Sequence, residues 1–306
     1  MSKNLKGAYT KLSLSMLAWA GVYHSAHFLV SSDVDIYTVA CVRYFLASII
    51  LLIVLQYKQG YIITREQFKQ NWAILINIGF IGIGIYNLVF LNAEKHLPAK
   101  MVALIFSITP CLTALLSSLY FKTKLSVVAY LGMIVALIGA VGVINYSNVE
   151  CGKYWCNLFN NLSVGEISSL ALCFAAASFN ILNRIATQKH INSLQITTFA
   201  AVFGCITLFI AMIIYGHPAT ITHQSFGFWL AMAYTVIIAS VLAYFWYSEA
   251  IRELGVPKTV IFVNAIPILT VIMDMIFYHH PVNVPVLVCG GIIISGVIIT
   301  NKAIIR

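Results

Sequence analysis

The sequence contains very little charge. Of its 306 residues, 9% are Asp, Glu, Lys or Arg, and 61% are apolar. Soluble globular domains carry about 25% charged residues. A chain with so few charges cannot give a soluble domain its polar surface, so this composition excludes an ordinary soluble fold and predicts a protein that crosses a membrane several times.

The sequence also lacks the alternation of apolar and polar residues that a membrane β-strand requires, and its apolar runs are about twice the length of such a strand. A bilayer core about 30 Å thick needs roughly 20 apolar residues per helix. The qualifying stretches are Leu12 to Val30, Ile36 to Tyr57, Trp72 to Asn92, Met101 to Phe121, Ser126 to Asn145, Gly165 to Ala186, Leu194 to Tyr215, Phe226 to Tyr247, Val256 to Tyr278 and Val284 to Thr300. We therefore predict an all-α membrane protein with ten transmembrane helices.

The second half of the chain repeats the first at an offset of 157 residues, which aligns Pro110 with Pro267 and Gly139 with Gly296. This predicts two five-helix repeats, residues 1–145 and 165–306, joined by an outward loop, residues 146–164. Because five is odd, the two repeats must insert in opposite directions. Inverted halves around a site near the bilayer midplane are typical of secondary transporters.

The net charge of +9 is explained by where the cations lie. Fourteen fall at the termini or in alternate connections, namely Lys3, Lys6, Lys11, Lys58, Arg65, Lys69, Lys122, Lys124, Arg184, Lys189, Arg252, Lys258, Lys302 and Arg306. The opposite side receives Lys95, Lys100 and Lys153. The positive-inside rule then places both termini in the cytoplasm. The basic excess reflects topology, so no nucleic-acid partner is predicted.

The cysteines do not form a metal-binding pattern. Five of the seven lie singly inside apolar stretches, whereas Cys151 and Cys156 share the outward loop. Two cysteines without a nearby histidine are too few ligands for a structural metal, and no cofactor is predicted. The loop pair is either a disulfide or two free thiols.

Two stretches of the chain resemble a known family. The first, from Leu91 to Ile144, is LNAEKHLPAKMVALIFSITPCLTALLSSLYFKTKLSVVAYLGMIVALIGAVGVI, and the second, from Ser248 to Thr300, has the same layout. Each combines a helix end, a helix with a midspan proline, a short polar loop and a glycine-bearing helix. This arrangement resembles the EamA-type members of the drug/metabolite transporter superfamily. The resemblance covers the whole chain and implies two inverted five-helix repeats.

The first two helices carry further resemblance, in Trp19 with Tyr23 and His27, and in Arg43 at the start of VRYFLASIILL. The chain departs from the family after the fourth and ninth helices. There Lys122-Thr123 and His279-His280 replace the usual Gly-Glu. No role of that glutamate is therefore transferred to this chain.

Midspan prolines and buried polar groups indicate the substrate site. Proline removes a backbone hydrogen bond, so Pro110 and Pro267 are predicted to break or kink their helices and open a cavity, the alternative being a simple bend. Asparagines in these helices must face inward, either toward other helices or toward substrate. The predicted substrate-binding residues are Trp19, Tyr23, Tyr86, Asn87, Phe90, Ser107, Pro110, Asn180, Tyr244, Tyr247, Asn264 and Pro267.

Few ionisable residues lie within the apolar stretches. Burying a charge in a membrane is costly, so Asp274 is expected to have a partner or a function, and the candidate partners are Arg43, His24 and His27. His27, Arg43 and Asp274 all fall in the outward half, where they predict one polar cluster that acts as a gate, a proton-coupling site or a static staple. Glu94 and Glu249 lie at helix ends and are expected to be solvated.

Together these features predict a secondary exporter or exchanger of a small organic metabolite, such as an amino acid or nucleoside, in a bacterial inner membrane. It is expected to act as a monomer or homodimer in the lipid bilayer. A passive facilitator is the alternative that the same repeats allow. A lipid-modifying membrane enzyme would need a cluster of His, Asp and Glu at the membrane surface, and the sequence offers none.

Overall fold

The computed structural model describes residues 5–60, 62–147, 162–254, 259, 262–278 and 284–304. Nearly all of these residues are helical, and none of them is in a strand. The all-α prediction is confirmed for this part of the chain. Cys151 and Cys156, with most of the predicted outward loop, lie outside the described residues, as do His279 and His280.

The helices fall into two series. The first comprises α1 (Leu5–Val30), α2 (Ile36–Gln59), α3 (Arg65–Gly79), the π-helix η1 (Phe80–Ile85), α4 (Tyr86–His96), α5 (Ala99–Phe106), α6 (Thr109–Phe121) and α7 (Val127–Ser147). The second comprises α8 (Val164–Gln188), α9 (Ser193–Tyr215), the 3₁₀-helix η2 (Pro218–His223), α10 (Phe226–Ala233), the π-helix η3 (Tyr234–Leu242), α11 (Ala243–Leu254), α13 (Ala265–Tyr278) and α14 (Val284–Ile304).

Side chains at the connections fix where the helices start and end. The Asp35 and Thr64 side chains accept hydrogen bonds from the first turns of α2 and α3, which satisfies amides that lack an intrahelical partner. Gly60 adopts a left-handed conformation, φ 72°, and ends α2. Such a φ favours glycine because it has no Cβ.

Eight helical segments within the described residues are long and apolar enough to cross a membrane. They are Ile36–Gln59, Arg65–His96, Ala99–Phe121, Val127–Ile144, Val164–Gln188, Ser193–Tyr215, Phe226–Tyr247 and Val284–Ala303. The two other predicted spans are not among these eight segments. Helix α1, which contains the first predicted span, has 26 residues and includes polar side chains such as His24 and His27. The predicted span from Val256 to Tyr278 lies partly outside the described residues, and its described helix α13 has 14 residues.

The third span of each series contains a π-helical segment. In one, α3, η1 and α4 run continuously from Arg65 to His96, and in the other, α10, η3 and α11 succeed one another from Phe226 to Leu254. The wider turns of a π-helix leave carbonyl groups without their usual helical partners and often mark functional sites. The two π-segments therefore provide sites where side chains can bond to the backbone in the middle of a span.

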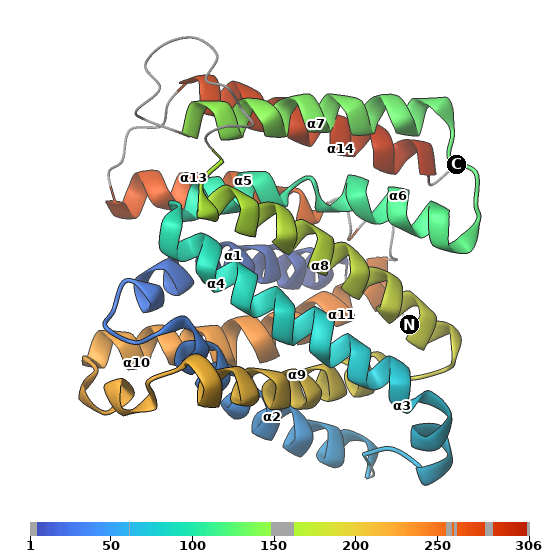
Figure 1. Ribbon diagram of the computed structural model, residues 1–306. Coiled ribbons are helices and arrows are strands. Elements are labelled where there is room, and N and C mark those ends of the chain that lie inside the picture. The colour runs from blue at the N-terminus through green and yellow to red at the C-terminus, as the bar shows by residue number, and fades with distance from the viewer. Residues whose placement is uncertain are drawn as a thin grey trace.

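Helix α1 is central to the packing and contacts α4, α5, α10, α11, α13 and η3. Helices α7 and α14 lie side by side along one edge of the molecule, next to the layer that contains α5, α6 and α13 (Figure 1). Many large apolar side chains are exposed on the outer helices, among them Ile138 on α7 and Ile213 on α9. Extensive exposed apolar surface is expected where lipid is the solvent.

Candidate functional site

Two aromatic clusters meet on α1. In the first, the Tyr23 ring lies 5.5 Å from that of Phe90 and 6.5 Å from that of Phe106. Tyr86 lies 6.3 Å from Phe90 and 6.2 Å from Phe106. These distances between ring centroids fall within the range of favourable aromatic pairs. Three of the predicted binding residues, Tyr23, Tyr86 and Phe90, thus come together around the end of α5.

The second cluster joins α1 to α11. The Trp19 ring lies 5.2 Å from Tyr244 and 5.0 Å from Tyr247. Its indole N–H donates to the Ala239 carbonyl in η3 at 3.2 Å. Trp19 and Tyr23 are four residues apart, and such residues lie on the same helix face. This face of α1 therefore connects the two clusters.

The proline-bearing segment of the first repeat is broken at the predicted position. Helix α5 ends at Phe106, and α6 begins at Thr109 with Pro110 in its first turn. Proline at position 110 cannot donate to the Phe106 carbonyl, which accepts the Thr109 hydroxyl at 2.6 Å instead. The Ser107 hydroxyl donates to Leu104 O. The break is adjacent to the first aromatic cluster through Phe106.

The segment containing Pro267 is also broken. Asn264 forms a turn just before α13 begins at Ala265. The position equivalent to Thr109 is occupied by Ile266, which has no hydroxyl to satisfy a freed carbonyl. The buried amide nitrogen of Asn264 has no hydrogen-bond partner among the described residues. The second break therefore presents a polar group that this part of the chain does not satisfy.

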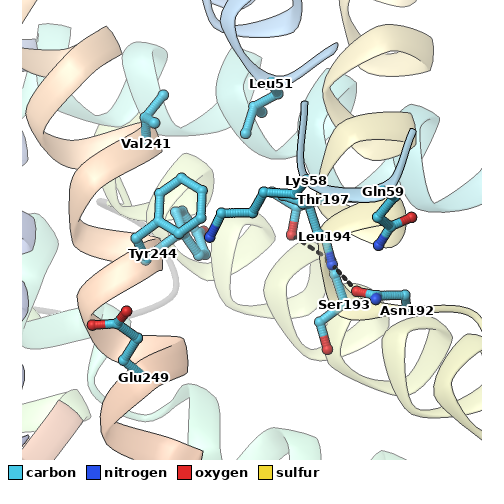
Figure 2. A pocket seen from close by; sticks show the side chains of 11 residues that line it. Leu51, Lys58, Gln59, Asn192, Ser193, Leu194, Thr197, Val241, Tyr244 and Glu249 are labelled. Atoms are coloured by element: carbon cyan, nitrogen blue, oxygen red, sulfur yellow. Dashed lines mark hydrogen bonds between the residues drawn. The ribbon is translucent and has the colours of Figure 1, made fainter. Parts of the chain in front are cut away.

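A cavity of about 540 Å³ lies between α2, α9 and α11. Its lining residues include Lys58, Ser193, Thr197, Tyr244 and Glu249 (Figure 2). Because Tyr244 also contacts Trp19, the cavity adjoins the second aromatic cluster. Of these five residues, sequence reasoning identified Tyr244. Lys58 and Glu249 have the charge pattern of ordinary helix ends, which conceals their place in the cavity.

Arg43 is buried, with 7% of its surface exposed. Its Nη1 lies 3.5 Å from Asn87 Oδ1, and its Nη2 lies 3.5 Å from Ser240 Oγ. Each neighbour also bonds to a π-segment, since Asn87 donates to Ile83 O and Ser240 donates to Thr235 O, both at 2.8 Å. The two π-helices therefore hold the polar side chains that face Arg43.

Within the predicted cluster of His27, Arg43 and Asp274, the pairing of Arg43 with Asp274 requires correction. Asp274 forms an ion pair with Lys100, whose Nζ lies 2.7 Å from Oδ2. The two residues are 3% and 8% exposed. The charge pattern predicts that Lys100 lies in an outer loop, but it is the second residue of α5, a helix buried from Ala99 to Ile105. The apolar run that follows Pro98 is the sequence signal for this burial.

His27 has a different acidic neighbour. Its Nδ1 lies 2.7 Å from the Glu94 carbonyl and 3.7 Å from Glu94 Oε2. Glu94 is fully buried, and neither of its carboxylate oxygens has a hydrogen-bond partner in the part of the chain that the structure describes. The expectation that Glu94 is solvated is wrong because α4 packs against α1 and α8 at this end. Glu249, in contrast, is 39% exposed at its side chain and pairs with Lys11 at 2.6 Å.

Asn180 lies apart from the ring contacts described above. Its exposed side chain donates to the Thr113 hydroxyl at 3.2 Å, one turn after Pro110 on α6.

Among the residues that the structure describes, no group of three His, Cys, Asp or Glu side chains is placed to hold a metal. The site consists of aromatic rings, amides and hydroxyls, with one buried guanidinium. Such a set binds small molecules through shape and hydrogen bonds.

Comparison with known proteins assigns the family. The model of the EamA-like transporter family matches twice, over residues 7–145 and 163–302. The uncharacterized transporter YyaM of Bacillus subtilis is 29% identical over 86% of this chain and 83% of its own. The uncharacterized transporter YetK of the same organism is 22% identical over 97% of this chain and 88% of its own.

A solved crystal structure with 15% sequence identity has a TM-score of 0.62 and covers 97% of this chain and 98% of that chain, so the two share a fold. The family and the names of the relatives indicate a transporter rather than an enzyme. They imply a small-molecule substrate and a membrane-embedded protein. With two copies of the family model over most of its length, the chain belongs to the EamA-like transporter family.

Proposed function

We propose that the protein is a secondary exporter or exchanger of a small organic metabolite, such as an amino acid or nucleoside, in a bacterial inner membrane. Its ten transmembrane helices form two inverted five-helix repeats, residues 1–145 and 165–306, connected by residues 146–164, with both termini cytoplasmic. It acts as a monomer or homodimer. A monomer is sufficient for transport because one chain contains both halves. The paired helix breaks and paired π-segments, each repeated at corresponding positions of the two series, support this arrangement.

The observation that carries the proposal is the amide of Asn264, which has no partner in the described part of the chain and lies at a midspan helix break. Substrate binds among the two aromatic clusters and the breaks at Ser107, Pro110, Asn264 and Pro267. Discontinuous helices in transporters commonly offer free backbone groups to substrate at this depth. The breaks also let each half-helix tilt separately, as alternating access requires.

On this proposal, the Lys58 and Glu249 end of the protein is open in this conformation and the Lys100 and Asp274 end is closed. The cavity begins at the first of these pairs and extends to Tyr244, and the buried ion pair joins α5 to α13 at the other. Under the proposed topology the opening faces the cytoplasm. The ion pair then acts as an outer gate that must separate before substrate leaves.

Three modes of transport differ in their energetics. A proton-coupled exporter would use His27 with Glu94, or Asp274, as the proton-binding group, whereas an exchanger or facilitator needs no such group. Counterflow in liposomes, with and without a pH gradient, separates these modes. Gradient-driven accumulation identifies coupling, counterflow alone identifies exchange, and equilibration without counterflow identifies a channel.

Asn264→Ala is expected to weaken substrate binding roughly three- to tenfold, the effect of losing about one hydrogen bond. Because this amide has no hydrogen-bond partner within the residues that the structure describes, its removal should leave the melting temperature unchanged or slightly raised. The measurement is the dissociation constant for the solute that a thermal-shift screen of amino acids and nucleosides identifies. The melting temperature is recorded beside it.

Asn77→Ala is the matched control for this experiment. Asn77 is exposed on α3, and its side-chain amide donates to Ala73 O at 2.7 Å within its own helix. This variant should bind substrate as the wild type does. Unchanged affinity together with a marked loss of stability in Asn264→Ala would show that Asn264 joins helices and does not contact substrate.

The orientation is tested with single cysteines in a cysteine-free background. Asp33 and Thr123 are both exposed in connections, between α1 and α2 and between α6 and α7. A membrane-impermeant thiol reagent should label Asp33→Cys in intact cells and Thr123→Cys only after permeabilisation, because the cation-rich connections face the cytoplasm. The reverse pattern would invert the proposed topology.

A further inference from the structure

Arg43 is a buried cation without an acidic partner among the described residues. The ion pairs of this part of the chain are Lys11 with Glu249, His27 with Glu94 and Lys100 with Asp274. None includes the guanidinium of Arg43, which stays charged at all physiological pH values. A buried charge that no opposite charge balances is strongly destabilising.

The hydrogen bonds of the guanidinium are weak. Both protein neighbours, Asn87 Oδ1 and Ser240 Oγ, lie at 3.5 Å, beyond the usual 2.7–3.2 Å range. Within the described chain, the buried Nε of Arg43 has no hydrogen-bond partner. The Tyr44 ring centroid lies 5.3 Å from the guanidinium carbon, which gives a modest cation–π attraction. The guanidinium therefore has N–H groups available for a stronger acceptor.

Arg43 is also near the route into the site. Ser240 is followed directly by Val241, which lines the cavity together with Tyr244 and Leu51. Leu51 lies two turns after Arg43 on the same helix, α2, and Figure 2 shows Val241 and Tyr244 on one helical ribbon beside the cavity. Asn87, the other neighbour of the guanidinium, directly follows Tyr86 of the first aromatic cluster. The two side chains that face the guanidinium are therefore next in sequence to a residue of the cavity lining and to a residue of an aromatic cluster.

We propose that Arg43 binds a carboxylate group of the transported substrate, so that the substrate is a small organic acid or a zwitterionic amino acid. This inference rests on the proposed transport function and names its substrate class. A carboxylate can accept two parallel N–H groups of one guanidinium. A single anionic charge balances the single buried cation, while Trp19, Tyr244 and Tyr247 are placed to receive an ammonium or apolar group of the same molecule. Nucleosides have no such anionic group.

The first test compares carboxylates with matched amides on the purified full-length protein. The probes are L-phenylalanine, L-leucine and L-glutamine, each against its C-terminal carboxamide, with adenosine and inorganic phosphate as further ligands. At least one carboxylate should bind about tenfold or more tightly than its amide, because hydrogen bonds to charged groups are the stronger kind. Equal binding by every pair, no binding by any carboxylate, or binding of adenosine or phosphate alone would overturn the proposal.

Two variants connect this preference to Arg43. Arg43→Gln should remove the preference for carboxylate over amide. Arg43→Lys keeps the charge but loses the paired geometry, so its affinity for the carboxylate should fall about tenfold or more. Full retention of the preference in Arg43→Gln would show that another group binds the acid.

The second test needs no ligand. If Arg43 binds substrate and does not stabilise the fold, Arg43→Gln should leave the melting temperature of the ligand-free protein unchanged or raised, because the substitution removes an unbalanced buried charge. A structural staple would instead lose several degrees. Transport itself distinguishes the two proposals. If the protein catalyses counterflow of a solute that has no carboxylate, and Arg43→Gln does not change the rate, the carboxylate site is refuted but the transport function is not. If the wild-type protein transports none of the solutes, the transport function itself is refuted.

Discussion

Removing either charge of the Lys100–Asp274 ion pair is expected to destabilise the protein by about 3–5 kcal/mol, because the remaining charge stays buried without its partner. The pair connects α5 to α13 at 2.7 Å, and its side chains are 10% and 4% exposed. The double variant Lys100→Met with Asp274→Leu should cost less than the sum of the single changes, since no charge is left unbalanced. Unfolding of the detergent-purified proteins measures all three.

The half-exposed pair of Lys11 and Glu249 is the control. Its N–O distance of 2.6 Å is as short, but its side chains are 41% and 39% exposed. Breaking a pair in contact with water should cost about 1 kcal/mol or less. If breaking either ion pair reduces the stability equally, burial does not determine how much the pair of Lys100 and Asp274 contributes to stability.

Transport by the same variants separates a gate from a coupling site. If the pair is an outer gate, counterflow should change in both single variants and recover in part in the double variant. If Asp274 is the coupling group, Asp274→Asn should abolish pH-gradient-driven uptake and spare counterflow, and no change at Lys100 should restore the coupling. Wild-type transport in every variant would assign the ion pair a purely structural role.

Gly296→Ala is expected to destabilise the protein by about 1–3 kcal/mol or more, the usual range for an extra methyl group forced into a packed interface. A Cβ at position 296 would overlap the backbone of Gly132 and Ala136 on α7. Backbone atoms of a helix cannot move aside singly, so α7 and α14 would have to separate. Thermal unfolding in detergent measures the effect.

Gly291 supplies the matched control on the same helix. It is exposed, and a Cβ there would meet nothing within 4 Å. Gly291→Ala should therefore stabilise the protein by up to about 1 kcal/mol, because alanine favours a helix over glycine. The two substitutions are chemically identical and are expected to have opposite signs. A loss of stability at both positions would contradict the packing explanation.

Much of the candidate site follows from local chemistry. Pro110 and Pro267 lack the N–H that a continuous helix needs, so the two breaks could be predicted from the sequence. Trp19 and Tyr23 share one face of α1 because they are four residues apart, and both meet aromatic partners there. Residue type and spacing within one helix were thus enough to predict that these residues lie in the aromatic clusters.

The charged groups could not be assigned in this way. Lys100 and Asp274 are 174 residues apart in the chain, and nothing local to either position identifies the other. Glu94 has the sequence context of an exposed helix end but is fully buried. The sequence predicts that Arg43 clusters with Asp274, whereas its hydrogen-bonding neighbours in the structure are Asn87 and Ser240 beside the two π-segments.

The sequence by itself determined that the chain is helical and membrane-embedded, because in lipid each segment must satisfy its own backbone hydrogen bonds and apolar length alone reports this. It also determined where proline interrupts two helices. Only the tertiary structure decided which charges pair, which carboxylate is buried and which cation has no acidic partner in the described chain. These outcomes depend on desolvation and on distances between side chains from different helices, which exist only once the helices have packed.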